Sequence, residues 1–98
     1  MDKLRRQVQQ IAASRGVTLV EDWHGIDCIL PLLEKVRLDG TVVVVKLTGV
    51  GRAPEPYMAL FTGGTLQHDF VRVTGTVLEE VVARALVNYA RRAWKFTG

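Results

Sequence analysis

The residues best suited to chemistry in this sequence lie in one short stretch, where Cys28 follows His24 by four positions and Asp27 by one. A cysteine thiolate beside an imidazole is the arrangement of a nucleophile and its base in cysteine-dependent enzymes. A single cysteine among isoleucines and leucines is more often a small buried hydrophobic side chain. Because Cys28 has such neighbours, the sequence predicts no catalytic residues and a protein that is not an enzyme.

Metal coordination is the second chemistry that these residue types allow. A structural zinc site needs four ligands, usually in paired spacings. The sequence holds one cysteine and two histidines, His24 and His68, which do not make up such a set. We therefore predict no metal site.

Two glycine-rich stretches have part of the pattern of a phosphate-binding loop. Gly49-Val50-Gly51 follows a predicted strand, as in a dinucleotide-binding fingerprint, but the third glycine and the following helix are missing. Gly63-Gly64 lacks the lysine that follows in a P-loop. The sequence therefore predicts no cofactor. The first stretch continues into a proline-containing loop, in which Arg52 and Glu55 are candidates for contact with a partner, since loops often carry binding residues.

Two amphipathic helices are predicted at the two ends of the chain. The first covers Met1–Arg15 and is followed by Gly16, a residue typical of the position after a helix. The second begins at Thr76 or Val77 and continues to about Trp94. Thr76 and Glu79 have the spacing of a capping box, in which each side chain bonds a free amide at the helix start.

Apolar strands separated by turn residues occupy the middle of the sequence. The predicted strands are Thr41–Leu47, Tyr57–Thr62 and Asp69–Thr74, with Lys35–Leu38 as a fourth. Asp39-Gly40 lies between the fourth strand and the first, and this dipeptide suits a type I′ hairpin turn. Four consecutive valines cannot alternate between a wet and a dry face, which predicts that their strand is central or covered on both faces.

The segment before the strands has weaker patterns. Val17–Val20 suits a short strand and Glu21–Gly25 a turn. Ile26–Leu33 is predicted as a short helix or an irregular segment, because Pro31 is tolerated only in the first turn of a helix.

Together these elements predict one α+β domain, residues 1–98. Its architecture is a three- or four-stranded antiparallel β-meander flanked by an N-terminal and a C-terminal α-helix. One cysteine excludes an internal disulfide, the N-terminus lacks the apolar core of a signal peptide, and no apolar run approaches the roughly 20 residues of a membrane span. We expect a cytoplasmic protein without membrane contact. Nine arginines against four lysines favour a GC-rich bacterial genome.

Positive charge is concentrated at the two ends of the chain. Residues 1–16 have a net charge of +3 and residues 84–98 of +4, whereas the middle has −4. If both terminal helices lie side by side on the sheet, their basic residues form one surface for nucleic acid or another acidic partner. The candidates are Arg5, Arg6, Arg84, Arg91, Arg92 and Lys95.

The order of one helix, three strands and one helix resembles that of double-stranded RNA-binding domains, which implies contact with RNA near the last helix. Those domains open that helix with lysines, whereas this chain has Glu79 and Glu80 there. The run Gly75–Glu80 is similar to the helix start of small HicB-like antitoxins. The function predicted from the residues is association with another protein or with a second copy as a homodimer. Nucleic-acid binding is the alternative.

Overall fold

The computed structural model describes residues 1–49, 51 and 54–98. Within these ranges the elements are α1 (Asp2–Ser14), α2 (Leu30–Leu38), β1 (Thr41–Leu47), β2 (Tyr57–Gly63), β3 (Phe70–Gly75) and α3 (Leu78–Ala93). Short 3₁₀ turns cover Ile26–Ile29 and Gly64–Leu66. The predicted α+β class is confirmed, with one helix more than expected.

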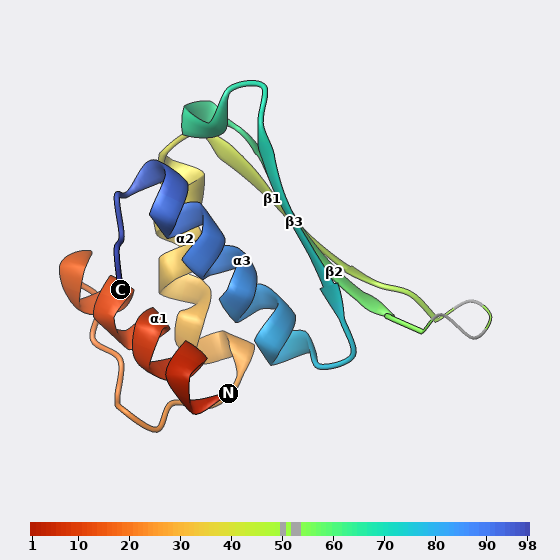
Figure 1. Cartoon of the computed structure of the whole chain (residues 1–98), viewed down its shortest axis with the longest axis horizontal. Helices are drawn as coiled ribbons and strands as arrows, with labels where there is room; N and C mark the ends of the chain where they lie inside the picture. Colours follow the sequence, from red (N-terminus) through yellow and green to blue (C-terminus); the bar gives the residue numbers. More distant parts are fainter. Residues whose placement is uncertain (50, 52–53) are drawn as a thin grey trace.

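The three strands form an antiparallel meander in the order β1-β2-β3. All described helices lie on one side of this sheet (Figure 1). The side chains of Val43, Phe61 and Val71 are paired across the strands and point toward the helices. The prediction that the valine-rich strand is central or covered on both faces is wrong, because β1 is an edge strand and Val42 and Val44 are exposed.

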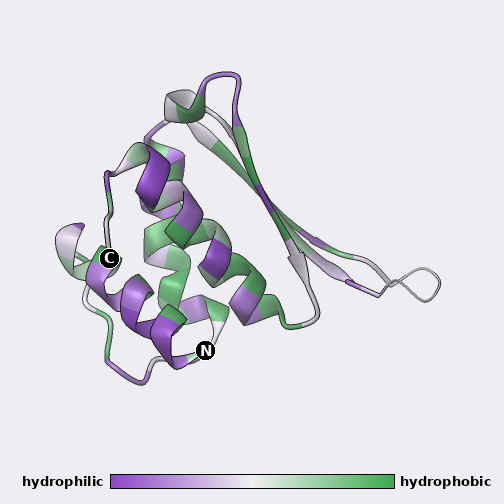
Figure 2. Ribbon diagram, viewed as in Figure 1, coloured by the Kyte–Doolittle hydropathy of each residue, from purple (hydrophilic) through white to green (hydrophobic). Residues whose placement is uncertain are grey.

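The helices form two layers on the covered side. α2 packs on β1, and α3 packs on β2 and β3. α1 packs on α3 instead of lying beside it on the sheet, so the condition under which the terminal helices would form one basic surface is not met. Figure 2 shows α1 as mostly hydrophilic and α3 as alternating hydrophilic and hydrophobic bands, which matches a surface helix above a helix with one buried side.

The end of α1 agrees with the sequence pattern. Val8, Ile11 and Ala12 form its buried stripe. After the helix, Gly16 has a φ of +72°, and the N–H of Val17 donates to the C=O of Ala12 at 2.9 Å. This is the Schellman arrangement, which needs a residue that tolerates positive φ. The predicted short strand at Val17–Val20 is absent from the described chain.

The structure of residues 30–38 shows that two predictions are wrong. Lys35–Leu38 is the last turn of α2 and not a strand. Asp39-Gly40 does not connect two strands: Asp39 has helical φ and ψ, and the N–H of Gly40 donates to the C=O of Arg37 at 2.9 Å, so the dipeptide ends the helix. Burial of Leu32, Leu33 and Val36 favours this helix, and Pro31 lies in its first turn, where the missing N–H costs nothing.

The predicted capping box at the start of α3 is also wrong. The N-cap residue is Val77, and no side chain of the described residues caps the helix. The carboxylate of Glu79 instead accepts the N–H of Gly25 at 3.2 Å and a guanidinium N–H of Arg5 at 3.3 Å. Glu79 therefore holds the connection between α1 and α2 against α3.

Candidate interaction surface

The side of the sheet opposite the helices is uncovered and mainly apolar. Its side chains form three rows across the strands, fixed by the register of β1, β2 and β3: Val42, Thr62 and Phe70; Val44, Leu60 and Arg72; Lys46, Met58 and Thr74. Val42 is 57% exposed, Val44 40% and Phe70 53%. We call these nine residues the open face. Apolar side chains dominate it, with Lys46 and Arg72 as its two charged residues.

The edge of β1 offers unpaired backbone groups beside the open face. The N–H of Thr48 donates to the C=O of Pro56 at 2.8 Å, and hydrogen-bonded pairs recur at every second residue of an antiparallel ladder. The backbone groups of Val42, Val44 and Lys46 therefore point toward β2. Those of Val43 and Val45 point away from the sheet. We call this outward side of β1, from Thr41 to Leu47, the β1 edge.

At the opposite edge of the sheet, side chains occupy the backbone groups of Phe70, the first residue of β3. The N–H of Phe70 donates to the Asp69 carboxylate at 2.8 Å. The C=O of the same residue accepts a guanidinium N–H of Arg92 at 2.7 Å, and Arg92 also pairs with Asp69 at 3.0 Å. Side chains that occupy edge backbone groups prevent the addition of another strand. Among the described residues, no side chain occupies the backbone groups of Val43 or Val45 in this way.

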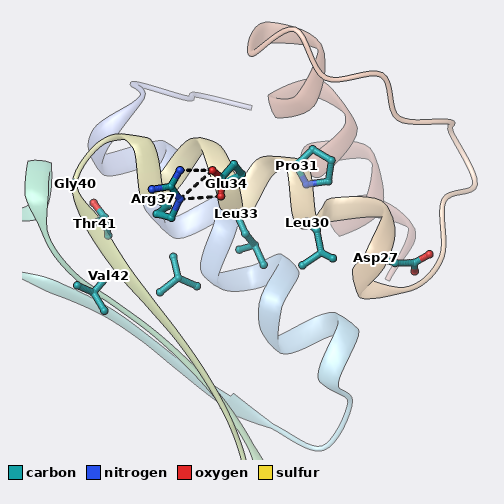
Figure 3. A pocket seen from close by; sticks show the side chains of 10 residues that line it. Asp27, Leu30, Pro31, Leu33, Glu34, Arg37, Gly40, Thr41 and Val42 are labelled. Carbon is teal, nitrogen blue, oxygen red and sulfur yellow. Dashed lines mark hydrogen bonds and ion pairs between the residues drawn. The ribbon is translucent and has the colours of Figure 1, made fainter.

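A groove of about 950 Å³ lies between the β1 edge and α2 (Figure 3). Leu30 and Leu33 line it from the helix, and Thr41 to Val43 line it from the strand. The ion pair of Glu34 and Arg37 lies at one end, and its hydrogen bonds hold the pKa of the Glu34 carboxyl below the usual value. The groove is therefore mainly apolar, with one neutralised charge pair and the carboxylate of Asp27 as its charged groups.

Four of the six basic residues predicted as an acidic-partner surface already have partners. Arg5 donates to the C=O of Trp23 at 2.9 Å and to Glu79. Arg84 pairs with Glu80, Arg92 with Asp69, and Arg91 donates to the C=O of Gly98 at 3.3 Å. Arg6 and Lys95 are exposed.

A different group of basic residues lines a pocket of about 580 Å³ between the start of α1, β3 and α3. Lys3, Arg72, Arg84 and Arg91 contribute positive charge there, and Glu80 contributes the one acidic side chain. Lys3 and Arg72 are not among the residues predicted from the sequence, because they belong to elements that only the fold brings together. Arg72 has no sequence signal beyond its place in an alternating strand.

The predicted interaction loop is described in part. Arg52 lies outside the described residues. Glu55 is exposed, and its carboxylate accepts the hydroxyl of Thr74 at 3.1 Å. This contact joins the end of the β1–β2 connection to strand β3, at the border of the open face.

Cys28 and the two histidines do not form a nucleophile and base in this structure. The thiol of Cys28 donates to the backbone C=O of His24 at 3.0 Å. The ring nitrogen Nδ1 of His24 lies 3.0 Å from the guanidinium of Arg5 instead. In the described part of the chain, no group of three or more histidine, cysteine, aspartate or glutamate side chains could hold a metal ion.

No helix in the described ranges has both the length and the apolar character needed to cross a lipid bilayer. Among the described residues, the open face, the β1 edge and the basic pocket are candidate contact surfaces for a partner. In comparisons with protein-family models, curated proteins and solved structures, nothing matches this chain.

Proposed function

We propose that this chain acts by binding another protein chain, with the open face and the β1 edge as its contact surface. The observation that carries this proposal is the one-sided cover of the sheet, which leaves Val42, Val44 and Phe70 exposed on the same face. Contiguous exposed apolar patches on small soluble domains commonly mark protein–protein contacts.

The size and chemistry of this surface suit a protein partner. A stable interface buries roughly 800 Å² on each chain, and removal of apolar surface from water contributes about 25 cal/mol per Å² before the costs of association. The nine side chains of the open face supply an apolar centre. Lys46 and Arg72 lie in its outer strands, so a partner with acidic residues around an apolar patch fits best.

A matched pair of valine substitutions tests the proposal. Val42→Glu places a charge in the open face, where the valine is 57% exposed, and Val20→Glu places the same charge at a valine 62% exposed in the connection after α1. We expect both variants to fold. Immobilised wild-type chain and Val20→Glu should retain the same proteins from a lysate, identified by mass spectrometry, and Val42→Glu should lose them. Equal retention by all three chains would contradict the proposal.

The basic pocket supports a second candidate function, binding of nucleic acid or another polyanion. It keeps Arg84 and Arg91 of the basic residues expected from the sequence and adds Lys3 and Arg72, with one acidic side chain among them. Contacts of this kind release counterions, so the affinity must fall steeply with salt. Gel shifts at two salt concentrations, with Arg72→Ala and Arg91→Ala against Arg37→Ala as the control, test it. Absence of a shift at low salt would exclude this function.

A further inference from the structure

We infer that the β1 edge pairs with a second copy of the chain, and that the two copies join their β1 strands antiparallel to form one continuous six-stranded sheet. The inference rests on the proposed function and concerns the β1 edge alone, so the open face stays available to a different partner. It starts from the difference between the two edges of the sheet. The β3 edge is closed at Phe70 by Asp69 and Arg92, whereas the described residues place no side chain on the outward groups of Val43 and Val45.

β1 has few of the features that usually keep an edge strand apart from others, and Lys46 is the one charged residue among its seven. Its seven residues pair with β2 in unbroken register, without a bulge or a proline. Long, regular, apolar edge strands pair readily with another strand. The space beside the β1 edge is the groove toward α2, so an incoming strand finds apolar side chains below it at Leu30 and Leu33.

The backbone pattern restricts how two copies can pair. Only residues whose N–H and C=O point outward can exchange hydrogen bonds, and in β1 these are Thr41, Val43, Val45 and Leu47. Full overlap of two antiparallel β1 strands sets Val43 opposite Val45 of the second copy and Thr41 opposite Leu47 of the second copy. The two-fold axis then passes between Val44 and Val44 of the second copy, which lie opposite each other.

Full overlap of the seven residues favours this register, and charge excludes the one centred on Lys46. Lys46 is the one charged residue of β1. With the axis at Val44, each Lys46 lies opposite Val42 of the other copy. With the axis shifted to Lys46, the two ammonium groups would lie opposite each other, which is destabilising for directly facing like charges. β1 is thus self-complementary, as a two-fold interface requires.

The same register explains why the apolar side chain of Leu47 is exposed in the single chain. Leu47 is 63% exposed although its side chain points to the helix side of the sheet. In the paired arrangement it lies opposite Thr41 of the second copy, which lines the end of that copy's groove. The two-fold axis is perpendicular to the sheet, so the open faces of both copies join on one side and the helices stay on the other.

Engineered cysteines test the register directly. In a Cys28→Ser background, Val44→Cys places two thiols opposite each other in a non-hydrogen-bonded pair, where the Cβ atoms are about 4.5–5.5 Å apart. Val42→Cys places them about 13 Å apart along the strands, too far for a disulfide. Mild oxidation should give a covalent dimer for Val44→Cys and at least tenfold less for Val42→Cys. Equal cross-linking, or none for Val44→Cys, would overturn the pairing.

A second variant distinguishes pairing through the β1 edge from contact through the open face. Val45→Pro removes an outward N–H without removing a bond to β2, and edge strands tolerate proline at such positions. We expect a chain with unchanged circular dichroism that no longer dimerises, as judged by light scattering. A folded Val45→Pro dimer would overturn the inference. Loss of the dimer in Val42→Glu alone would move the contact to the open face, leaving the proposed function intact and refuting the edge pairing.

Discussion

The hydroxyl of Tyr89 donates a hydrogen bond to the carboxylate of Asp39 at 2.7 Å, which joins α3 to the turn between α2 and β1. The same carboxylate oxygen accepts the indole N–H of Trp94 at 2.7 Å. Because Tyr89 gives its one proton to Asp39, the hydroxyls of Thr41 and Thr65 donate to the Tyr89 oxygen, at 3.1 and 2.9 Å. This network fixes the first residue of β1 relative to the helices and so sets the position of the β1 edge.

Replacement of Tyr89 by phenylalanine tests the importance of this network. Tyr89→Phe removes the hydrogen bond to the Asp39 carboxylate, and hydrogen bonds to charged groups contribute about 1.5–3 kcal/mol. We expect the free energy of unfolding, measured by urea denaturation, to fall by this amount. Tyr57→Phe is the control, because among the described residues no hydrogen bond of the Tyr57 hydroxyl is found. Equal stability of both variants would show that the network contributes little.

Tyr89 also predicts how stability depends on pH. Burial raises the pKa of the Tyr89 hydroxyl above its usual value of 10.0. The unfolded chain therefore loses this proton at a lower pH than the folded chain does, so the contribution is fully present below about pH 10 and is lost as the pH rises toward the folded pKa. Unfolding free energies between pH 9 and 11 should fall more steeply for wild type than for Tyr89→Phe. Parallel curves would contradict this assignment.

Gly64 and Gly16 separate the cost of a backbone conformation from the cost of close packing. Both have positive φ, +55° and +72°. A Cβ at Gly64 would lie 2.7 Å from the Thr41 hydroxyl and 2.8 Å from the C=O oxygen of Asp39, whereas a Cβ at Gly16 meets no atom within 4 Å. Gly16→Ala should lower the unfolding free energy by about 1 kcal/mol. Gly64→Ala should lower it clearly more, and a smaller effect at Gly64 would refute the close approach.

Thr76 and Glu79 test which contacts hold the start of α3. Because Thr76 does not cap the helix, Thr76→Ala should change the unfolding free energy by less than about 0.5 kcal/mol. Glu79→Ala removes the acceptor of Gly25 and Arg5 and should cost more, since hydrogen bonds to charged groups contribute about 1.5–3 kcal/mol. A loss of about 1 kcal/mol in Thr76→Ala would instead support the capping box.

The sequence predicts correctly those helices and strands whose own residues show a clear local pattern. β1 consists mostly of β-branched residues, α3 is long enough for a clear helical repeat, and Gly16 marks the end of α1. Lys35–Leu38 is too short for this, because alternation over four residues fits the last turn of a helix equally well. Burial of Val36 against distant residues decides between them, and that information is not local.

The surface was harder to predict for the same reason. Four consecutive valines give no alternation, so the sequence does not show that Val42 and Val44 face away from the helices. The charge pattern did not reveal that Arg5 is engaged by Trp23 and Glu79, which are 18 and 74 residues away. The candidate contact surface depends on which sheet face the helices leave uncovered, and this is a property of the assembled fold.

The mass of the chain in solution tests the central claim most directly. Light scattering of the wild-type protein should give about twice the 10.9 kDa of one chain, and the mass should fall toward that of one chain on dilution. Val45→Pro should give the mass of one chain at every concentration. A wild-type protein that keeps the mass of one chain at the highest concentration would contradict the pairing of two β1 edges.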